Sequence, residues 1–207
     1  MPEQWPPPEP EGAPAPGQIY RLAWIFYLIL AVAGVIWIGW SRGSIPVDLV
    51  FDPRRWWLDV VLGAGAGLLL VAGWHLGRRF LPMMRELEEL LRRHLGPLDG
   101  SEVFALAVIS GIAEELFFRG AMQSSWGWIW ATLVFTLVHT GPGPAFRMWT
   151  LFALVAGLVF AGLTLYRGNI LAAILAHFLV NWINLHALLV PAPEAPGGVP
   201  PSPPGGQ

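Results

Sequence analysis

Residues 111–120 read GIAEELFFRG, so two adjacent glutamates and an arginine stand inside an apolar part of the chain. The flanking segments, SEVFALAVIS before it and WGWIWATLVFTLVH shortly after it, carry one further charged residue between them. An ionisable side chain inside a membrane costs about 2.5–3.5 kcal/mol on insertion scales, unless it is paired or faces a wet cavity. Glu114, Glu115 and Arg119 therefore need partners or a function that offsets this cost.

The composition of the whole chain indicates an integral membrane protein. Of the 207 residues, 55% are hydrophobic and 13% are charged, and the mean hydropathy is +0.54. Soluble domains carry about 25% charged residues. The net charge of −2 gives no basic surface for nucleic acid. Cysteine and lysine are both absent, which excludes disulfides, thiol nucleophiles and Schiff-base lysines.

Long uncharged stretches divide the chain into candidate membrane spans. A bilayer crossing needs about 20 apolar residues, and residues 22–41, for example, contain no charge. The sequence predicts six spans, at roughly 20–40, 57–77, 102–123, 126–141, 147–166 and 169–190. We therefore expect an all-α fold, a polytopic membrane helix bundle with about six transmembrane helices.

Residues 78–95, RRFLPMMRELEELLRRHL, have a different character from the predicted spans. Apolar residues recur there at helical spacing, and two Glu–Arg pairs stand four residues apart. This pattern predicts one amphipathic interfacial helix. Its five arginines favour a cytoplasmic location, since cytoplasmic loops are enriched in Lys and Arg. An even number of spans then predicts that both termini are cytoplasmic.

The two ends of the chain are rich in proline and differ from the rest. Residues 1–18 and residues 191–207 are predicted to be disordered tails. Residues 19–99 would hold the first two spans and the amphipathic helix. Residues 100–190 would form a core that carries the intramembrane polar residues.

Within this core, spacing separates the two glutamates. Glu115 and Arg119 are four residues apart with the acid first, which is the favourable order for an ion pair on a helix. Adjacent helical residues point about 100° apart, so Glu114 cannot share that partner. Glu114 is therefore left as an ionisable residue without a local counter-charge.

Polar residues on the following spans could meet Glu114. His139 follows Phe135 by one helical turn, and Asn181 follows His177 in the same way. At 1.5 Å per residue, Glu114 would lie about 15 Å deep, His139 about 20 Å and His177 about 14 Å. A carboxylate, two imidazoles and an amide at one depth would supply a base, a proton partner and oxyanion donors. Each could instead serve as a structural hydrogen-bond partner between helices.

The ordered set EExxxR (Glu114, Glu115, Arg119), FxxxH (Phe135, His139) and HxxxN (His177, Asn181) resembles the CPBP family. This family comprises CAAX prenyl endopeptidases of the Ras-converting type and bacterial relatives in bacteriocin processing and self-immunity. All three motifs are intact, in order and on separate predicted spans, and the resemblance covers about residues 100–190.

The resemblance implies an intramembrane endopeptidase of the glutamate type, which hydrolyses a peptide bond of a membrane-associated protein or peptide. Glu114 would be the general base that activates water together with His139, while His177 and Asn181 would hold the oxyanion. Glu115, Arg119 and Phe135 would support the site. No cofactor is expected. The bilayer and a membrane-associated peptide or protein are the expected partners, and nucleic acid is not expected.

Two alternatives stay open at this point. A zinc-dependent peptidase could bind the metal through Glu114, His139 and His177, although no HExxH motif is present. A non-catalytic immunity or binding protein could share the fold. Arginine replaces lysine throughout, and the chain is rich in Pro, Gly and Ala, which points to a bacterial plasma membrane. A peptide leader, a membrane-anchored tail or a bacteriocin could be the substrate there.

Overall fold

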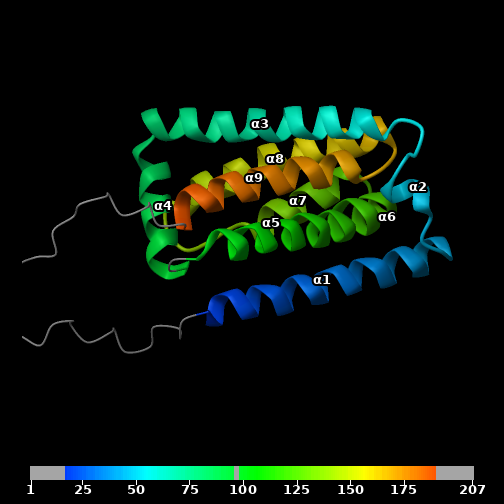
Figure 1. The fold of residues 1–207 in the computed structure, drawn as a ribbon, viewed down its shortest axis with the longest axis horizontal. Helices are drawn as coiled ribbons and strands as arrows, with labels where there is room; N and C mark the ends of the chain where they lie inside the picture. Colours follow the sequence, from blue (N-terminus) through cyan, green and yellow to red (C-terminus); the bar gives the residue numbers. More distant parts are fainter. Residues whose placement is uncertain (1–16, 96–97, 190–207) are drawn as a thin grey trace, which may run out of the picture.

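The computed structural model describes residues 17–95 and 98–189, and within these ranges every regular element is helical. The helices lie side by side along one axis, with the shorter α4 across one end (Figure 1). The predicted disordered tails, residues 1–18 and 191–207, lie outside the described residues, except for Gly17 and Gln18. The predicted all-α fold is confirmed for the described part.

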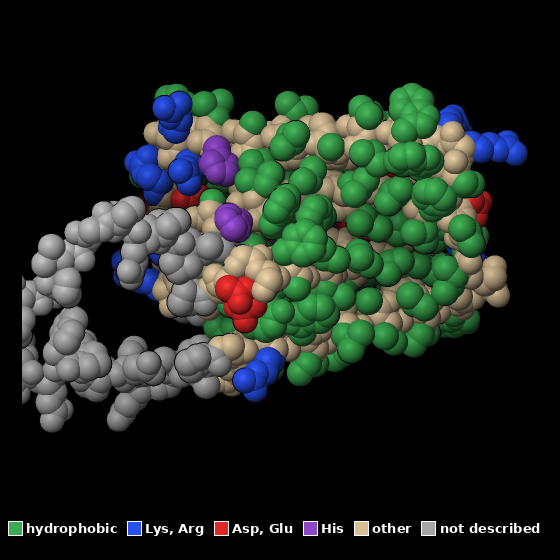
Figure 2. All heavy atoms as spheres, viewed as in Figure 1, with side chains coloured by type: hydrophobic (Ala, Val, Ile, Leu, Met, Phe, Trp, Pro, Cys, Tyr) green, Lys and Arg blue, Asp and Glu red, His purple; other side chains and the backbone are tan. Residues whose placement is uncertain are grey.

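Among the residues that the structure describes, four helices are long and apolar enough to cross a membrane, which indicates an integral membrane protein. On the face shown in Figure 2, apolar side chains cover the middle, and most charged side chains lie towards the two ends. These helices match four of the six predicted spans. They are α1 (Gln18–Arg42), α3 (Trp56–Phe80), α8 (Phe146–Arg167) and α9 (Leu171–Leu189).

The other two predicted spans are divided or short. The predicted span 102–123 forms α5 (Gly100–Glu115) and η1, a π-helical segment over Leu116–Gln123, followed by the single turn α6 (Ser124–Trp126). Wide π-type turns are rare and frequently occur at functional sites. The predicted span 126–141 is the 11-residue helix α7 (Trp128–Val138), which ends just before His139.

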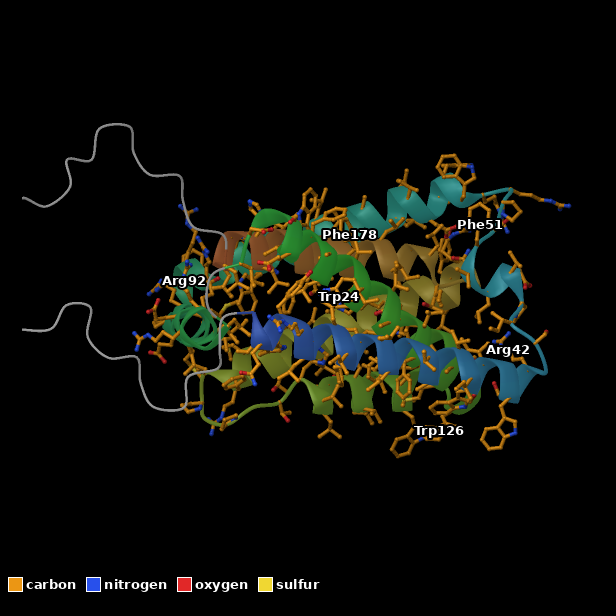
Figure 3. All side chains as sticks on the ribbon, turned by 60° about the horizontal axis from the view of Figure 1, so that its bottom comes forward. Trp24, Arg42, Phe51, Arg92, Trp126 and Phe178 are labelled. Carbon is orange, nitrogen blue, oxygen red and sulfur yellow. The ribbon has the colours of Figure 1, made fainter. Side chains whose placement is uncertain are left out.

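The predicted amphipathic helix is present as α4 (Pro82–Leu95). Proline cannot donate the hydrogen bond that a continuing helix needs, so α3 ends and α4 starts in a new direction. Leu87 of α4 is 1% exposed and packs with Trp74 of α3, while Arg92 points outward at this end (Figure 3). Arg42 and Trp126 mark the opposite end (Figure 3), where the short helix α2 (Val47–Val50) lies.

Glycines allow α3 to pack closely against α9. A Cβ atom at Gly63 would lie 2.5 Å from the carbonyl oxygen of Ala172, and one at Gly67 would lie 2.9 Å from that of Ala176. The GxxxG spacing in the sequence therefore marks a true helix contact. This contact fixes the position of α9, whose other side carries His177 towards α5.

A buried ion pair joins helices at the end opposite α4. Nε of Arg167 donates to Oδ1 of Asp59 at 2.6 Å, and Asn169 donates to Oδ2 of the same carboxylate at 3.3 Å. Asp59 is fully buried. The network ties α3 to the turn between α8 and α9, so it supports the bundle at a distance from the polar residues of the core.

The first turn of α5 is held by a capping box. The Asp99 carboxylate accepts from the backbone N–H groups of Ser101 and Glu102, and the Glu102 side chain accepts from the Asp99 N–H. A hydrogen bond from the Ser101 hydroxyl, with those backbone bonds, holds the pKa of Asp99 below its ordinary value. The cap defines where α5 begins and so where its polar residues fall along the bundle.

Candidate functional site

A cavity of about 300 Å³ is lined by residues of α1, α3, α4, α5, α7, α8 and α9. Most of its wall is apolar, and the polar groups come from helices far apart in sequence. The polar lining residues are Tyr20, Tyr27, Glu88, Ser110, Glu114, His139, His177, Asn181 and Asn184. All four residues predicted as catalytic from the sequence therefore line one cavity.

Glu114 and His139 face each other across this cavity. Oε2 of Glu114 lies 3.7 Å from Nε2 of His139, which is too long for a direct hydrogen bond but short enough for a shared water molecule. Nδ1 of His139 lies 2.7 Å from the carbonyl oxygen of Phe135. Because that oxygen can only accept, Nδ1 carries the proton, and Nε2 is free to face the carboxylate.

Glu115 occupies a different environment from its neighbour. Its side chain is fully buried, with Oε2 3.5 Å from Nε of Arg119 and Oε1 2.8 Å from Nδ1 of His177. The predicted pairing with Arg119 is present. The contact with His177 was missed in the sequence analysis, which gave Glu115 only one partner. The crossing of α5 and α9 brings them together, and no spacing rule within a single helix predicts it.

Arg119 is 1% exposed and is enclosed by aromatic rings. Its guanidinium lies 4.7 Å from the ring centre of Phe135 and 5.7 Å from that of Phe160, and it donates to the carbonyl oxygen of Gly157 at 3.2 Å. Phe135 also lies 4.4 Å from the ring of His139. Phe135, predicted as a supporting residue, thus packs against both the arginine and the histidine.

Asn181 is held by a residue that the sequence analysis did not select. Its Nδ2 donates to the Ser110 hydroxyl oxygen at 2.9 Å, which leaves the second N–H of the amide available. Ser110 is 2% exposed and precedes Glu114 by one turn on α5. Its spacing in the sequence could have identified Ser110, because a residue four positions before an intramembrane carboxylate shares its helix face.

Two further lining residues were also missed. Phe160 of α8 stacks on His177, with ring centres 5.0 Å apart and planes inclined by 21°. Tyr27 of α1 lines the same cavity as Glu114. α1 carries none of the three motifs, so nothing in the sequence connected it with the site.

The geometry gives no support for the predicted zinc alternative. Among residues 17–95 and 98–189, no three His, Cys, Asp or Glu side chains are grouped so as to hold a metal ion. Of the three residues named for zinc, His177 directs Nδ1 at Glu115, which leaves only its Nε2 available to a ligand. Zinc sites that act on peptides use three converging protein ligands, an arrangement these residues do not form.

The arrangement has the parts needed for hydrolysis by activated water. A carboxylate and an imidazole face one point of the cavity, and an amide and a second imidazole line the same space. A base near a water molecule and donors near a developing oxyanion are the elements of acyl-transfer catalysis without a covalent nucleophile.

Residues 99–183 match the model of the family described as Type II CAAX prenyl endopeptidase Rce1-like. This segment includes all three motifs and runs from the cap of α5 into α9. Comparison with curated proteins and with solved structures returned no match. The matched segment contains most of the polar residues that line the cavity. The polar lining residues outside it are Tyr20 and Tyr27 of α1, Glu88 of α4 and Asn184.

Proposed function

We propose that the chain, whose residues 99–183 form a domain of the Rce1-like type II CAAX prenyl endopeptidase (CPBP) family, is an intramembrane endopeptidase of the glutamate type. One observation carries this proposal furthest. Oε2 of Glu114 is buried, has no hydrogen-bond partner among the described residues and lies 3.7 Å from Nε2 of His139. A protein that only bound a peptide would have no use for such a costly carboxylate.

Glu114 would act first as a base and then as an acid. It accepts a proton from a water molecule held between it and His139, while the water oxygen bonds to the carbonyl carbon of the substrate. The tetrahedral intermediate then collapses, the C–N bond breaks, and Glu114 returns the proton to the leaving nitrogen. The products are a carboxylic acid and an amine, and the Glu114 carboxylate is restored.

His177 and Asn181 would stabilise the oxyanion of the intermediate. Asn181 has one amide N–H bonded to Ser110 and a second available for the oxyanion. His177 can donate from both ring nitrogens only when the imidazole is protonated, and the Glu115 carboxylate at Nδ1 balances that charge. Arg119 and Phe135 would hold this pair in place.

In the membrane we propose six crossings, with α5–η1 and α7 added to the four long helices. α4 would lie at the interface, where its buried face packs on the bundle and its arginines meet water. Arg21 and Arg147 also belong to the α4 end, because α1 and α8 start there. The excess of arginine makes this end, and both termini, cytoplasmic.

The substrate would be a membrane-associated peptide or protein that reaches the cavity from the α4 end. The cavity wall there consists of leucines from α4, α5 and α9, which suit an apolar or lipid-bearing chain. These lining residues are Leu87, Leu91, Leu95, Leu106, Leu185, Leu188 and Leu189.

The experiment uses purified protein in proteoliposomes, with a prenylated peptide ending in a CAAX sequence and a set of unlipidated apolar peptides as probes. Mass spectrometry should detect both fragments of at least one probe with wild type and none with Glu114→Gln. Intact probes with wild type would overturn the peptidase proposal. If both proteins bound a probe equally without cleavage, the non-catalytic binding protein would be favoured instead.

A further inference from the structure

A groove of about 420 Å³ runs between α3 and α8, on the outer side of the bundle. The described residues that line it are all apolar or glycine. Leu70 and Trp74 of α3 are buried and form its floor. Leu69 of α3 and Leu151 of α8 are exposed and form its rim. An exposed rim of leucines faces lipid when the helices span a membrane, so hydrocarbon rather than water fills this groove.

Glycines on α3 shape the groove. Gly73 is exposed, and a Cβ atom added there would meet no atom within 4 Å, so the missing side chain leaves a hollow. One turn later, a Cβ atom at Gly77 would lie 2.9 Å from the sulfur of Met84. Met84 belongs to α4 and also lines the groove. The hollow therefore extends along α3 and α8 and is bounded by α4 at one end.

The length of the groove matches one leaflet of a bilayer. Its lining residues run from Ala66 to Gly77 on α3 and from Met148 to Val159 on α8. Each stretch advances by eleven residues, which is about 16 Å at 1.5 Å per residue. The hydrocarbon core of a bilayer is about 30 Å thick, so the groove spans about half of it. A helix about 10 Å across would fill about 1,200 Å³ over that length, so a single hydrocarbon chain fits the groove better than a helix from a second copy.

Two arginines lie at the α4 end of this groove. Arg147 directly precedes Met148, the first lining residue of α8. Arg79 follows Gly77, the last lining residue of α3, by two positions. Both arginines are exposed, and neither forms an ion pair with a carboxylate of residues 17–95 or 98–189. Arginines at a membrane interface attract anionic lipids, and a guanidinium group binds phosphate through charge-assisted hydrogen bonds.

We propose that this groove binds one anionic phospholipid, with an acyl chain along α3 and α8 and the phosphate group at Arg79 and Arg147. The site goes beyond the proposed peptidase function and does not depend on it. Trp74 and Phe152 line both the groove and the cavity that contains Glu114, and their rings pack edge to face with centres 5.1 Å apart. The bound acyl chain therefore supports, from the lipid side, two rings that the groove shares with the cavity.

Native mass spectrometry of the full-length protein in detergent tests the class of lipid. The probes are phosphatidylglycerol and phosphatidylcholine with the same acyl chains, so that only the headgroups differ. Each arginine near the membrane surface favours an anionic lipid, and for two of them we expect phosphatidylglycerol to bind about 10- to 30-fold more tightly than phosphatidylcholine. Equal affinities of wild type for the two lipids would overturn the proposal.

The place of the acyl chain is tested by Gly73→Leu, with Gly65→Leu as the matched control. Both glycines are exposed on α3, and an added Cβ atom meets no atom within 4 Å at either position, but only Gly73 lines the groove. We expect Gly73→Leu to lower the affinity for phosphatidylglycerol about tenfold or more, because the leucine side chain occupies the space of the acyl chain. Gly65→Leu should bind as wild type does. Equal affinities of the two variants would contradict the proposed place.

The place of the phosphate group is tested by the double variant Arg79→Gln/Arg147→Gln. Its control is Arg42→Gln/Arg54→Gln, which removes the same charge from exposed arginines at the opposite end of the bundle. The first variant should bind both lipids with similar affinity, whereas the control should keep the preference for phosphatidylglycerol. A preference that persists in the first variant would overturn the phosphate site. A dimer that forms in wild type and is lost in Gly73→Leu would assign the groove to a second copy and overturn the lipid site.

Discussion

Nδ1 of His177 lies 2.8 Å from Oε1 of Glu115, the glutamate whose side chain does not line the cavity. The two adjacent glutamates thus have separate partners on separate helices. Glu114 faces His139, while Glu115 joins His177 to Arg119. This division explains why the sequence needs both acids in one apolar segment, since each is stabilised by a different set of neighbours.

Replacement of Glu115 by glutamine should destabilise the fold. The variant leaves Arg119 as a buried charge without its counter-ion and weakens the hydrogen bond to His177. Breaking a buried ion pair lowers the free energy of unfolding by about 3–5 kcal/mol. Thermal unfolding in detergent measures the effect. The matched control is Glu89→Gln, which removes the same i,i+4 contact to an arginine at the exposed surface of α4, where such pairs contribute about 0.3–0.5 kcal/mol. Equal Tm values for the two variants would contradict the assignment.

Removal of the Asn181 amide should affect turnover more than substrate binding. We expect Asn181→Ala to lower kcat about 10²–10³-fold with little change in KM, as loss of an oxyanion donor does. Ser110→Ala, which only frees the amide to rotate, should lower kcat by about tenfold or less. Asn184→Ala is the control, because Asn184 lies on the same helix and in the same cavity. An Asn181→Ala variant as active as this control would exclude the oxyanion role.

The close approach of α3 and α9 predicts a position-specific effect of added methyl groups. Gly63→Ala would place Cβ 2.5 Å from the carbonyl oxygen of Ala172, whereas Gly65→Ala meets no atom within 4 Å. Forcing a group into a packed contact costs about 1–3 kcal/mol, so Gly63→Ala should lower the Tm while Gly65→Ala should not. The same Tm for both variants would argue against this helix contact.

Chelation distinguishes the glutamate mechanism from the zinc alternative. Zinc bound to two histidines and a glutamate would leave slowly in a strong chelator, and activity would fall and return on re-addition. The glutamate mechanism predicts unchanged cleavage after chelator treatment and no stoichiometric metal by elemental analysis of the purified protein. Stoichiometric zinc whose removal stops cleavage would replace the proposed mechanism while keeping the peptidase.

Several features of this fold could be predicted from sequence because they depend on local periodicity or on composition. The long apolar helices, the amphipathic α4 and the Glu115–Arg119 pair follow from spacing within one segment. The depth of each polar residue along its helix is also a local quantity, which is why Glu114, His139 and His177 could be placed at one level.

Features that depend on contacts between helices could not be predicted in this way. The π-helical turn after Glu115 and the end of α7 before His139 have no periodic signal. The Glu115–His177 contact depends on how α5 crosses α9, and the presence of α1 residues in the cavity wall depends on how α1 packs on η1. Sequence spacing within one helix contains no information on such crossings.

Single-turnover cleavage by wild type and Glu114→Gln tests the central claim most directly. The amide is nearly isosteric with the acid but cannot accept a proton from water, so folding should be retained while the chemical step is lost. Rapid-quench measurements with enzyme in excess over the cleaved probe report the chemical step alone. A Tm of Glu114→Gln equal to that of wild type shows that the variant is folded. The account predicts a fall of at least about 10²–10⁴-fold in the single-turnover rate constant. An unchanged rate constant in Glu114→Gln would contradict the assignment of Glu114 as the base.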